Sequence, residues 1–156
     1  MGSASLGPGQ RGGLVAILTP QEVQAALSKL PVVDHHGEVV EQVGDGELRM
    51  RLPFKPDYMG RDVWKGSGAR VYSGPMVLGF ADTAMYACIV GTLGADTLGI
   101  IQTMTANFLR PAKETELIAQ VRIVRRGTRS LYLEAFLYSD GDAEPVAHVT
   151  ATAAIR

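Results

Sequence analysis

Apolar and polar residues alternate through most of the second half of the chain. Leu131, Leu133, Ala135 and Leu137, for example, fall on one face of a single extended run. A period of two residues is typical of a strand with one buried face. We therefore predict six strands, over residues 37–43, 47–52, 98–109, 114–125, 131–138 and 146–155.

The segment before these strands has helical periodicity instead. Thr19-Pro20-Gln21-Glu22 matches a capping box with proline at the first helical position. We predict an amphipathic helix from Pro20 to about Leu30, ended by Pro31. Its apolar face consists of Val23, Ala26, Leu27 and Leu30.

A second helix, from about Pro75 to Thr92, is apolar nearly all round. Residues 74–95 contain one charged side chain, Asp82, and their length is close to the roughly 20 residues that span a membrane. A carboxylate near the middle of a bilayer is costly, and the flanks show no basic asymmetry. We predict that this helix is buried in protein, with no membrane partner.

The order of these elements predicts the architecture. One helix, two strands, an apolar helix and four strands favour an α+β fold, in which a curved antiparallel sheet wraps around the apolar helix. A chain of 156 residues and 16.7 kDa has room for one such domain. We place it at residues 16–156, and predict a flexible N-terminal arm at residues 1–15, which begin with a stretch rich in Gly, Pro and Ser.

Composition narrows the partners and the compartment. The net charge of −1 argues against a nucleic-acid partner. A single cysteine, Cys88, excludes an intrachain disulfide and a thiolate zinc cluster, and residues 14–18 are too short an apolar run for a signal peptide. We predict a cytoplasmic protein without a metal. His35-His36 lacks partners at metal spacing and is interpreted as a surface or loop pair.

Asp82 is the first candidate for chemistry. Its neighbours one turn away, Leu78, Gly79, Met85 and Tyr86, supply no basic partner, so we expect its carboxylate to be at least partly buried. Burial without a partner costs several kcal/mol or raises a pKa. A protein that retains this cost often uses the carboxylate as a base or nucleophile. An Asp turned to solvent, or satisfied by a neighbouring strand, is an equally good interpretation.

The start of the same helix is the second candidate. With Pro75 at the first helical position, Gly74 would be the cap, and its N–H could point at an incoming oxygen. Asp82 lies about 12 Å of helical rise further along. One chain therefore does not obviously bring the two groups together. An ordinary helix cap is the simpler interpretation of this feature taken alone.

Three segments together resemble one family. Ser73 to Ile89 (SGPMVLGFADTAMYACI), Asn107 to Ala112 (NFLRPA) and Val124 to Arg129 (VRRGTR) resemble hotdog-fold acyl-CoA thioesterases of the PaaI-like (phenylacetic acid degradation type) branch. Gly74 matches the first Gly of that family's His-Gly-Gly, and Asp82 its acidic position. The order of elements matches from about Val32 to Ile155.

The resemblance implies a hotdog fold, a homo-oligomer (dimer or tetramer) and hydrolysis of an acyl-CoA substrate without a metal or redox cofactor. Each active site would span two subunits. Gly74 N–H of one chain would polarise the thioester carbonyl, and Asp82 of the other would attack it or activate water. The arginine turn, defined here as Arg125, Arg126 and Arg129, could hold the phosphates of coenzyme A. A solvated hairpin tip explains these arginines equally well.

The sequence departs from the family at supporting positions. Ser73 stands in place of the His, Pro75 in place of the second Gly, and Ile101 in place of a Ser or Thr that positions water. Ser67 falls nearest the family's Asn, so Ser67 and Ser73 are candidate substrate-binding residues. These departures keep a second hypothesis open, a non-catalytic module that binds acyl thioesters. A third hypothesis, a dehydratase, would need a catalytic His, and the position of His148 on the last predicted strand does not suit that role.

Overall fold

A computed structural model of the chain describes residues 18–31, 36–60, 66 and 68–156. The predicted N-terminal arm and Ser67 lie outside these ranges. The elements are α1 (Pro20–Leu27), β1 (Val39–Gly44), β2 (Glu47–Leu52), α2 (Gly74–Leu93), β3 (Gly99–Phe108), β4 (Leu117–Arg126), β5 (Ser130–Ser139) and β6 (Ala147–Ile155), with a 3₁₀ turn at Pro56–Tyr58.

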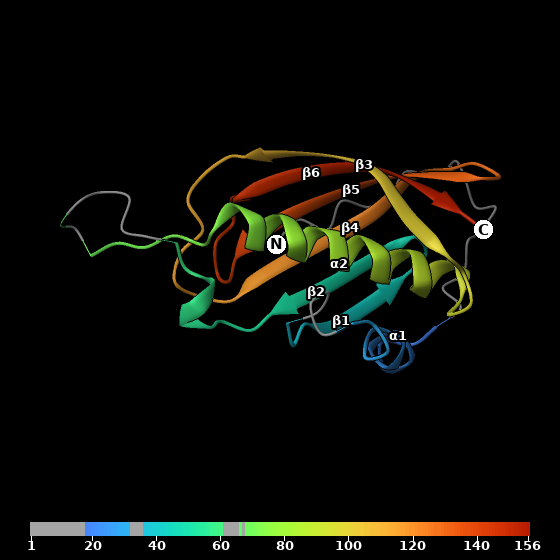
Figure 1. Ribbon diagram of the computed structural model, residues 1–156, viewed down its shortest axis with the longest axis horizontal. Helices are drawn as coiled ribbons and strands as arrows, with labels where there is room; N and C mark the ends of the chain where they lie inside the picture. Colours follow the sequence, from blue (N-terminus) through green and yellow to red (C-terminus); the bar gives the residue numbers. More distant parts are fainter. Residues whose placement is uncertain (1–17, 32–35, 61–65, 67) are drawn as a thin grey trace.

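The strands form one antiparallel sheet in the order β1-β2-β4-β5-β6-β3. The sheet curves around α2, which runs along its concave side, and α1 lies beside β1 (Figure 1). The inward residues of β2, β4, β5 and β6 alternate with outward ones and are buried against α2. This is the predicted α+β arrangement, and it is a hotdog-type fold.

Helix α1 begins as predicted and ends one turn early. Thr19 and Glu22 form the reciprocal capping box, and Val23 and Leu27 are buried. The helix ends at Leu27, not near Leu30, because Ser28 Oγ donates to the carbonyl of Ala25 at 2.7 Å and the following turn has i→i+3 bonds.

Helix α1 also covers one edge of the sheet. The Gln24 amide donates to the carbonyl of Glu38 at 2.9 Å and accepts the N–H of Val40 at 2.8 Å. These bonds occupy backbone groups at the start of edge strand β1. The opposite edge strand, β3, has no comparable cover within the part of the chain that the structure describes.

Helix α2 is long and apolar enough to cross a membrane by length and composition, but 67% of its most apolar stretch is buried inside the protein. It is therefore the core helix. Its residues Phe80, Ala84 and Ile89 are fully buried. A narrow stripe of Pro75, Gly79 and Asp82, spaced four and three residues apart, is exposed on the side away from the sheet.

This placement corrects the prediction for Asp82. We expected a carboxylate at least partly buried, and in the subunit it is exposed. The physical reason is that the sheet wraps around only part of the helix. The low polarity of the helix concealed which side remains uncovered, because small residues such as Gly79 contribute little to an amphipathic pattern.

Candidate active site

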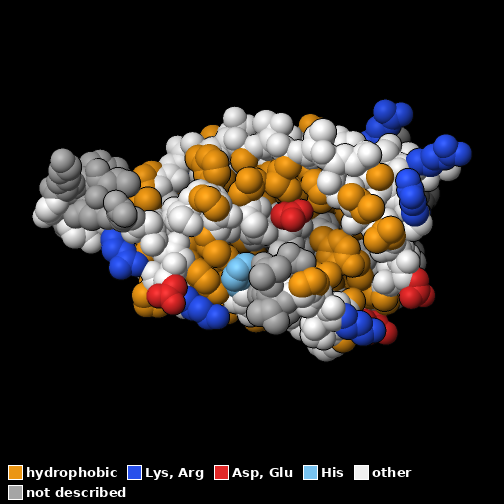
Figure 2. Space-filling model, in the orientation of Figure 1, with side chains coloured by type: hydrophobic (Ala, Val, Ile, Leu, Met, Phe, Trp, Pro, Cys, Tyr) orange, Lys and Arg blue, Asp and Glu red, His pale blue; other side chains and the backbone are white. Residues whose placement is uncertain are grey.

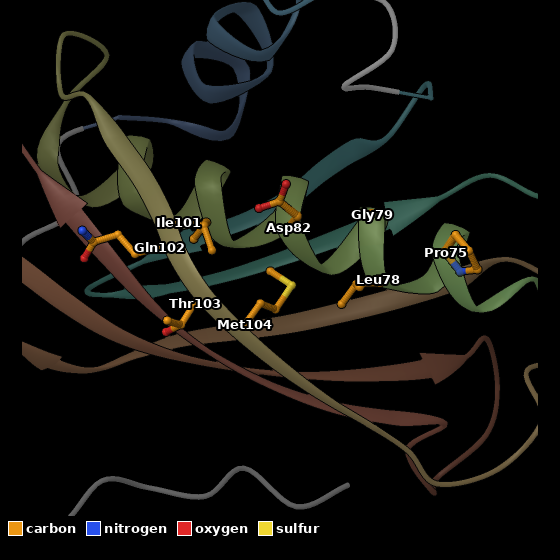
Figure 3. Close-up of a pocket in the computed structure, with 8 residues that line it drawn as sticks. All are labelled: Pro75, Leu78, Gly79, Asp82, Ile101, Gln102, Thr103 and Met104. Carbon is orange, nitrogen blue, oxygen red and sulfur yellow. The ribbon is translucent and has the colours of Figure 1, made fainter.

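A cleft runs between α2 and β3 with Asp82 on its wall. It has a volume of about 480 Å³ and is lined by the helix residues Pro75, Leu78, Gly79 and Asp82 and by residues 101–104 of β3. Figure 3 shows the helix side chains facing the strand across this cleft. In the space-filling view, an acidic side chain lies in the middle of a largely apolar face (Figure 2).

Asp82 also lines a second cleft on its other side. This cleft, of about 390 Å³, is bounded by Thr83 and Tyr86 of α2, by Ile100 of β3 and by His36 of the segment before β1. The Thr83 hydroxyl donates to the carbonyl of Gly79 at 3.2 Å. One carboxylate therefore opens onto two adjoining clefts, one in which Gln102 and Thr103 are the other polar residues and one that contains an imidazole.

The N-terminus of α2 differs in register from the prediction. Ser73, not Gly74, is the N-cap, and its Oγ accepts the N–H of Met76 at 3.3 Å. Gly74 is the first helical residue and Pro75 the second. Serine is favoured at the N-cap because its side-chain oxygen accepts a backbone N–H of the first turn, and glycine has no side chain to do so. Ser73, predicted as a substrate-binding residue, thus has a structural role as the cap, and direct contact with substrate remains a prediction.

After this shift in register, the backbone N–H of Gly74 is still available as a hydrogen-bond donor. No acceptor for its N–H is found within the described residues, as expected for the first turn of a helix. Gly74 lies in a third cleft of about 420 Å³ with Phe108 and Leu109 at the end of β3. Tyr72 lines this cleft as well, and burial raises its pKa to about 12, so its hydroxyl remains a neutral donor to the carbonyl of Thr115 at 2.7 Å.

Gly74 and Asp82 of one chain open onto different clefts. The structure therefore agrees with the helical-rise argument that one subunit does not bring them together. Gly74 lies near Phe108, where β3 ends, and Asp82 lies near Ile101, closer to where β3 begins.

The arginine turn is far from Gly74 in the same subunit. Arg125, Arg126 and Arg129 are all exposed at the β4–β5 hairpin. The strand registers connect this hairpin through β6 to the beginning of β3, whereas Gly74 lies near the other end of that strand. A strand of ten residues spans about 33 Å. Within one chain, the arginines and the helix start are at opposite ends of the sheet (Figure 1).

The other candidates also have defined positions. Cys88 is fully buried, and burial raises its pKa to about 12, as suits a small residue of the core. His148 lies on β6, where its Nε2 is 2.8 Å from Glu134 Oε1, and it lines none of the clefts described above. No cluster of three potential metal ligands occurs among the described residues.

Sequence reasoning missed His36 as a member of the site. The histidine was interpreted as a surface or loop residue, and it does lie in a loop, but its side chain lines the second cleft with Asp82. The signal available in the sequence was the spacing His36-Gly37-Glu38 directly before a strand. That spacing does not specify that His36 lies at the same cleft as Asp82 of α2.

Comparison with known proteins gives a family match over part of the chain. Residues 71–146 match the family model described as the thioesterase superfamily. A search of curated proteins finds no match. Solved structures share the fold at low sequence identity.

Three of these structures show the extent of the likeness. A protein of Silicibacter sp. TM1040, provisionally named a thioesterase, has a TM-score of 0.78 and 22% identity, and the match covers 93% of this chain and 96% of that one. A thioesterase of Haemophilus influenzae has a TM-score of 0.76, 15% identity and coverages of 92% and 94%. A phenylacetic acid degradation-related protein of Ralstonia eutropha JMP134 has a TM-score of 0.69, 23% identity and coverages of 85% and 98%.

The matched segment contains α2 and three of the six strands, β3, β4 and β5, and it includes Gly74, Asp82 and the arginine turn. Over these residues the chain resembles the thioesterase superfamily, and its fold is of the hotdog type. This match supports hydrolysis of acyl thioesters as the general activity.

Proposed function

We propose that the protein hydrolyses acyl-CoA thioesters, with Asp82 of one subunit and the Gly74 N–H of a second subunit acting on the same thioester. The observation that carries this proposal is the exposed carboxylate of Asp82 on the wall of an otherwise largely apolar cleft. An apolar cleft suits an acyl chain, and a carboxylate at its wall can attack the thioester carbon or activate water.

The uncovered edge of β3 supports the proposal that a second subunit takes part in the site. In the described part of the chain, seven large hydrophobic residues are strongly exposed, and four of them lie on β3 or beside its ends: Leu98, Ile100, Phe108 and Leu109. A two-fold copy that pairs along this edge must be antiparallel, since the same patch meets itself. The end of β3 near Gly74 would then lie beside the partner's start of β3, on the Asp82 side.

The same symmetry would bring the arginine turn to the reaction site. The arginines lie at the β3-start end of their own sheet, so antiparallel pairing would carry a partner's turn toward the Gly74 end. There it could hold the phosphates of coenzyme A while the acyl group enters the apolar cleft.

Ser67 remains a candidate substrate contact. We place the protein in the cytoplasm, as a homodimer or tetramer without a nucleic-acid partner.

A panel of acyl-CoA substrates with a thiol-trapping dye tests the proposal. Cys88 is fully buried with a raised pKa, so it should contribute no signal of its own in the folded protein. We expect thiol release that depends on enzyme, and a loss of at least about a hundredfold in Asp82→Asn, the scale of lost base catalysis. Asp96→Asn, which changes an exposed carboxylate after α2, is the matched control.

The alternative is a module that binds acyl thioesters without hydrolysing them. It is favoured by the apolar Ile101 in the cleft of about 480 Å³, where the family has a hydroxyl that positions water. Saturable acyl-CoA binding with no thiol release from any substrate would favour this alternative. Full activity of Asp82→Asn would exclude the proposed role of its carboxylate.

A further inference from the structure

A histidine and a buried glutamate form a pair beside the Asp82 carboxylate. Nδ1 of His36 lies 3.5 Å from Glu38 Oε1. Both atoms are buried, and neither has a hydrogen-bond partner among the described residues. The Glu38 side chain is only 2% exposed, whereas that of His36 is 35% exposed. The pair therefore has one buried end, at the carboxylate, and one open end, at the imidazole.

The backbone around His36 is held in place on both sides. The N–H of His36 donates to Glu38 Oε2 at 2.5 Å, and its carbonyl accepts the Tyr58 hydroxyl at 3.0 Å. The Tyr58 ring meets the imidazole edge-on, with centroids 5.9 Å apart. Gln24 fixes the backbone on either side of residue 39 through its bonds to Glu38 and Val40. This loop presents its histidine in a defined orientation.

The open end of the imidazole faces the cleft. His36 lines the cleft that Asp82 and Thr83 also line. Because Nδ1 is buried against Glu38, the exposed part of the ring is the part that carries Nε2. A carboxylate that faces Nδ1 favours the tautomer with the proton on Nδ1, and this leaves Nε2 as a proton acceptor.

The burial of Glu38 needs an explanation beyond packing. Burying a carboxylate is costly unless its oxygens are well paired, and among the described residues Oε1 is paired only with His36 Nδ1, at 3.5 Å. A neutral or apolar residue would fill this position at lower cost. The arrangement is that of a residue kept to orient a histidine, as in hydrolases where a buried carboxylate fixes the tautomer of the base.

We propose that His36 is a further catalytic residue of this site and that Glu38 is its positioning residue. This inference rests on the proposed thioester hydrolysis and assigns its second step. An oxygen of Asp82 bonds to the acyl carbon, the C–S bond breaks, and the sulfur leaves as the thiolate with the electron pair. Water then attacks the acyl carbon, its proton passes to His36 Nε2, and the bond from the carbon to Asp82 breaks. The products are the carboxylic acid and a regenerated Asp82 carboxylate, and the proton on His36 returns to solvent.

The first set of variants tests His36 itself. His36→Gln and His36→Ala should lower kcat by about 100-fold or more, the scale of general-base catalysis, with little change in KM. Imidazole added to His36→Ala should restore part of the lost rate, because the cleft is open. His148→Gln is the matched control: His148 also faces a glutamate, at 2.8 Å, but lines none of the three clefts, and it should retain the wild-type rate.

Glu38→Gln separates positioning from structural support. The amide retains the shape and can still accept the His36 N–H, so the melting temperature should be unchanged or raised. Its NH₂ would face Nδ1 and favour the wrong tautomer, so kcat should fall at least tenfold.

A wild-type kcat in His36→Gln, or a loss in His36→Ala that imidazole does not restore, would overturn the inference. If Asp82→Asn still loses activity in that case, the proposed function stands without His36. Full activity in both variants would remove both proposals.

Discussion

Gly91 of α2 and Val43 of β1 approach so closely that a β-carbon on Gly91 would lie 2.8 Å from Val43 Cγ1. Val23 of α1 is nearly as close, at 3.3 Å. Valine is short and stiff at χ1, so neither neighbour can easily move away. This contact fixes how deeply the C-terminal half of the core helix lies in the sheet, and thereby the position of its outer stripe.

The contact predicts a stability change opposite in sign to helix propensity. Alanine is favoured over glycine in a helix by up to about 1 kcal/mol, but overpacking costs about 1–3 kcal/mol. Gly91→Ala should therefore lower the free energy of unfolding. Gly79→Ala is the control on the same helix: nothing lies within 4 Å of its β-carbon position, so it should raise that free energy. Denaturant titrations of both variants measure the difference, and stabilisation by Gly91→Ala would refute the close-packing argument.

The fold could be predicted because its signals are local and repeated. Alternation in β2, β4, β5 and β6 depends on a single buried face, and the observed strands differ from the predicted ranges by at most a few residues. The capping box at Thr19 likewise needs only neighbouring residues. These patterns follow from burial, so they appear in the sequence before any tertiary contact is known.

The site could be predicted only in part. Asp82 and Gly74 were found through their residue types, but the exposure of Asp82 depends on how far the sheet wraps around α2. Ser73 is the N-cap in place of Gly74 because its side-chain oxygen accepts a backbone N–H. The sequence pattern alone does not show which of the two residues caps the helix. The place of His36 depends on the fold of a loop, where neither helical nor strand periodicity exists to guide a prediction.

Removing the Gly74 N–H should test the proposed oxyanion donor directly. Gly74→Pro deletes this N–H, and proline is tolerated in the first turn of a helix. Ser73 before it is already extended, with ψ of 140°, as a residue that precedes proline requires. We expect kcat to fall by about 100- to 1000-fold, the cost of one oxyanion-hole donor.

Gly74→Ala is the control for this change, because it retains the N–H. Its β-carbon would lie 3.8 Å from Phe108 Cζ, an ordinary contact. It should keep most of the activity. Equal losses in the two variants would point to crowding of the cleft and not to loss of the donor.

The open edge of β3 predicts that assembly and activity are lost together. Ile100 on this strand is 48% exposed, and a lysine there should prevent edge-to-edge pairing. Ile100→Lys should shift the mass measured by light scattering from at least twice 16.7 kDa toward the monomer, with activity lost and far-UV circular dichroism unchanged. Val124→Lys, at 49% exposure on β4, should remain assembled. A wild type that is a stable monomer would exclude the two-subunit site.

The arginine turn predicts a split between two kinds of substrate. Arg125, Arg126 and Arg129 are exposed, and their proposed contact is with the phosphates of coenzyme A, a part of the substrate remote from the thioester. Such contacts support binding, and their loss should raise KM more than it lowers kcat. Coenzyme A carries phosphates that a pantetheine thioester lacks. The double variant Arg126→Ala with Arg129→Ala should therefore impair acyl-CoA hydrolysis and spare acyl-pantetheine hydrolysis. The expected loss is about 1–3 kcal/mol per charge-assisted contact, and it should shrink as salt is added. Equal effects on both substrates would return the arginines to the role of a solvated hairpin tip.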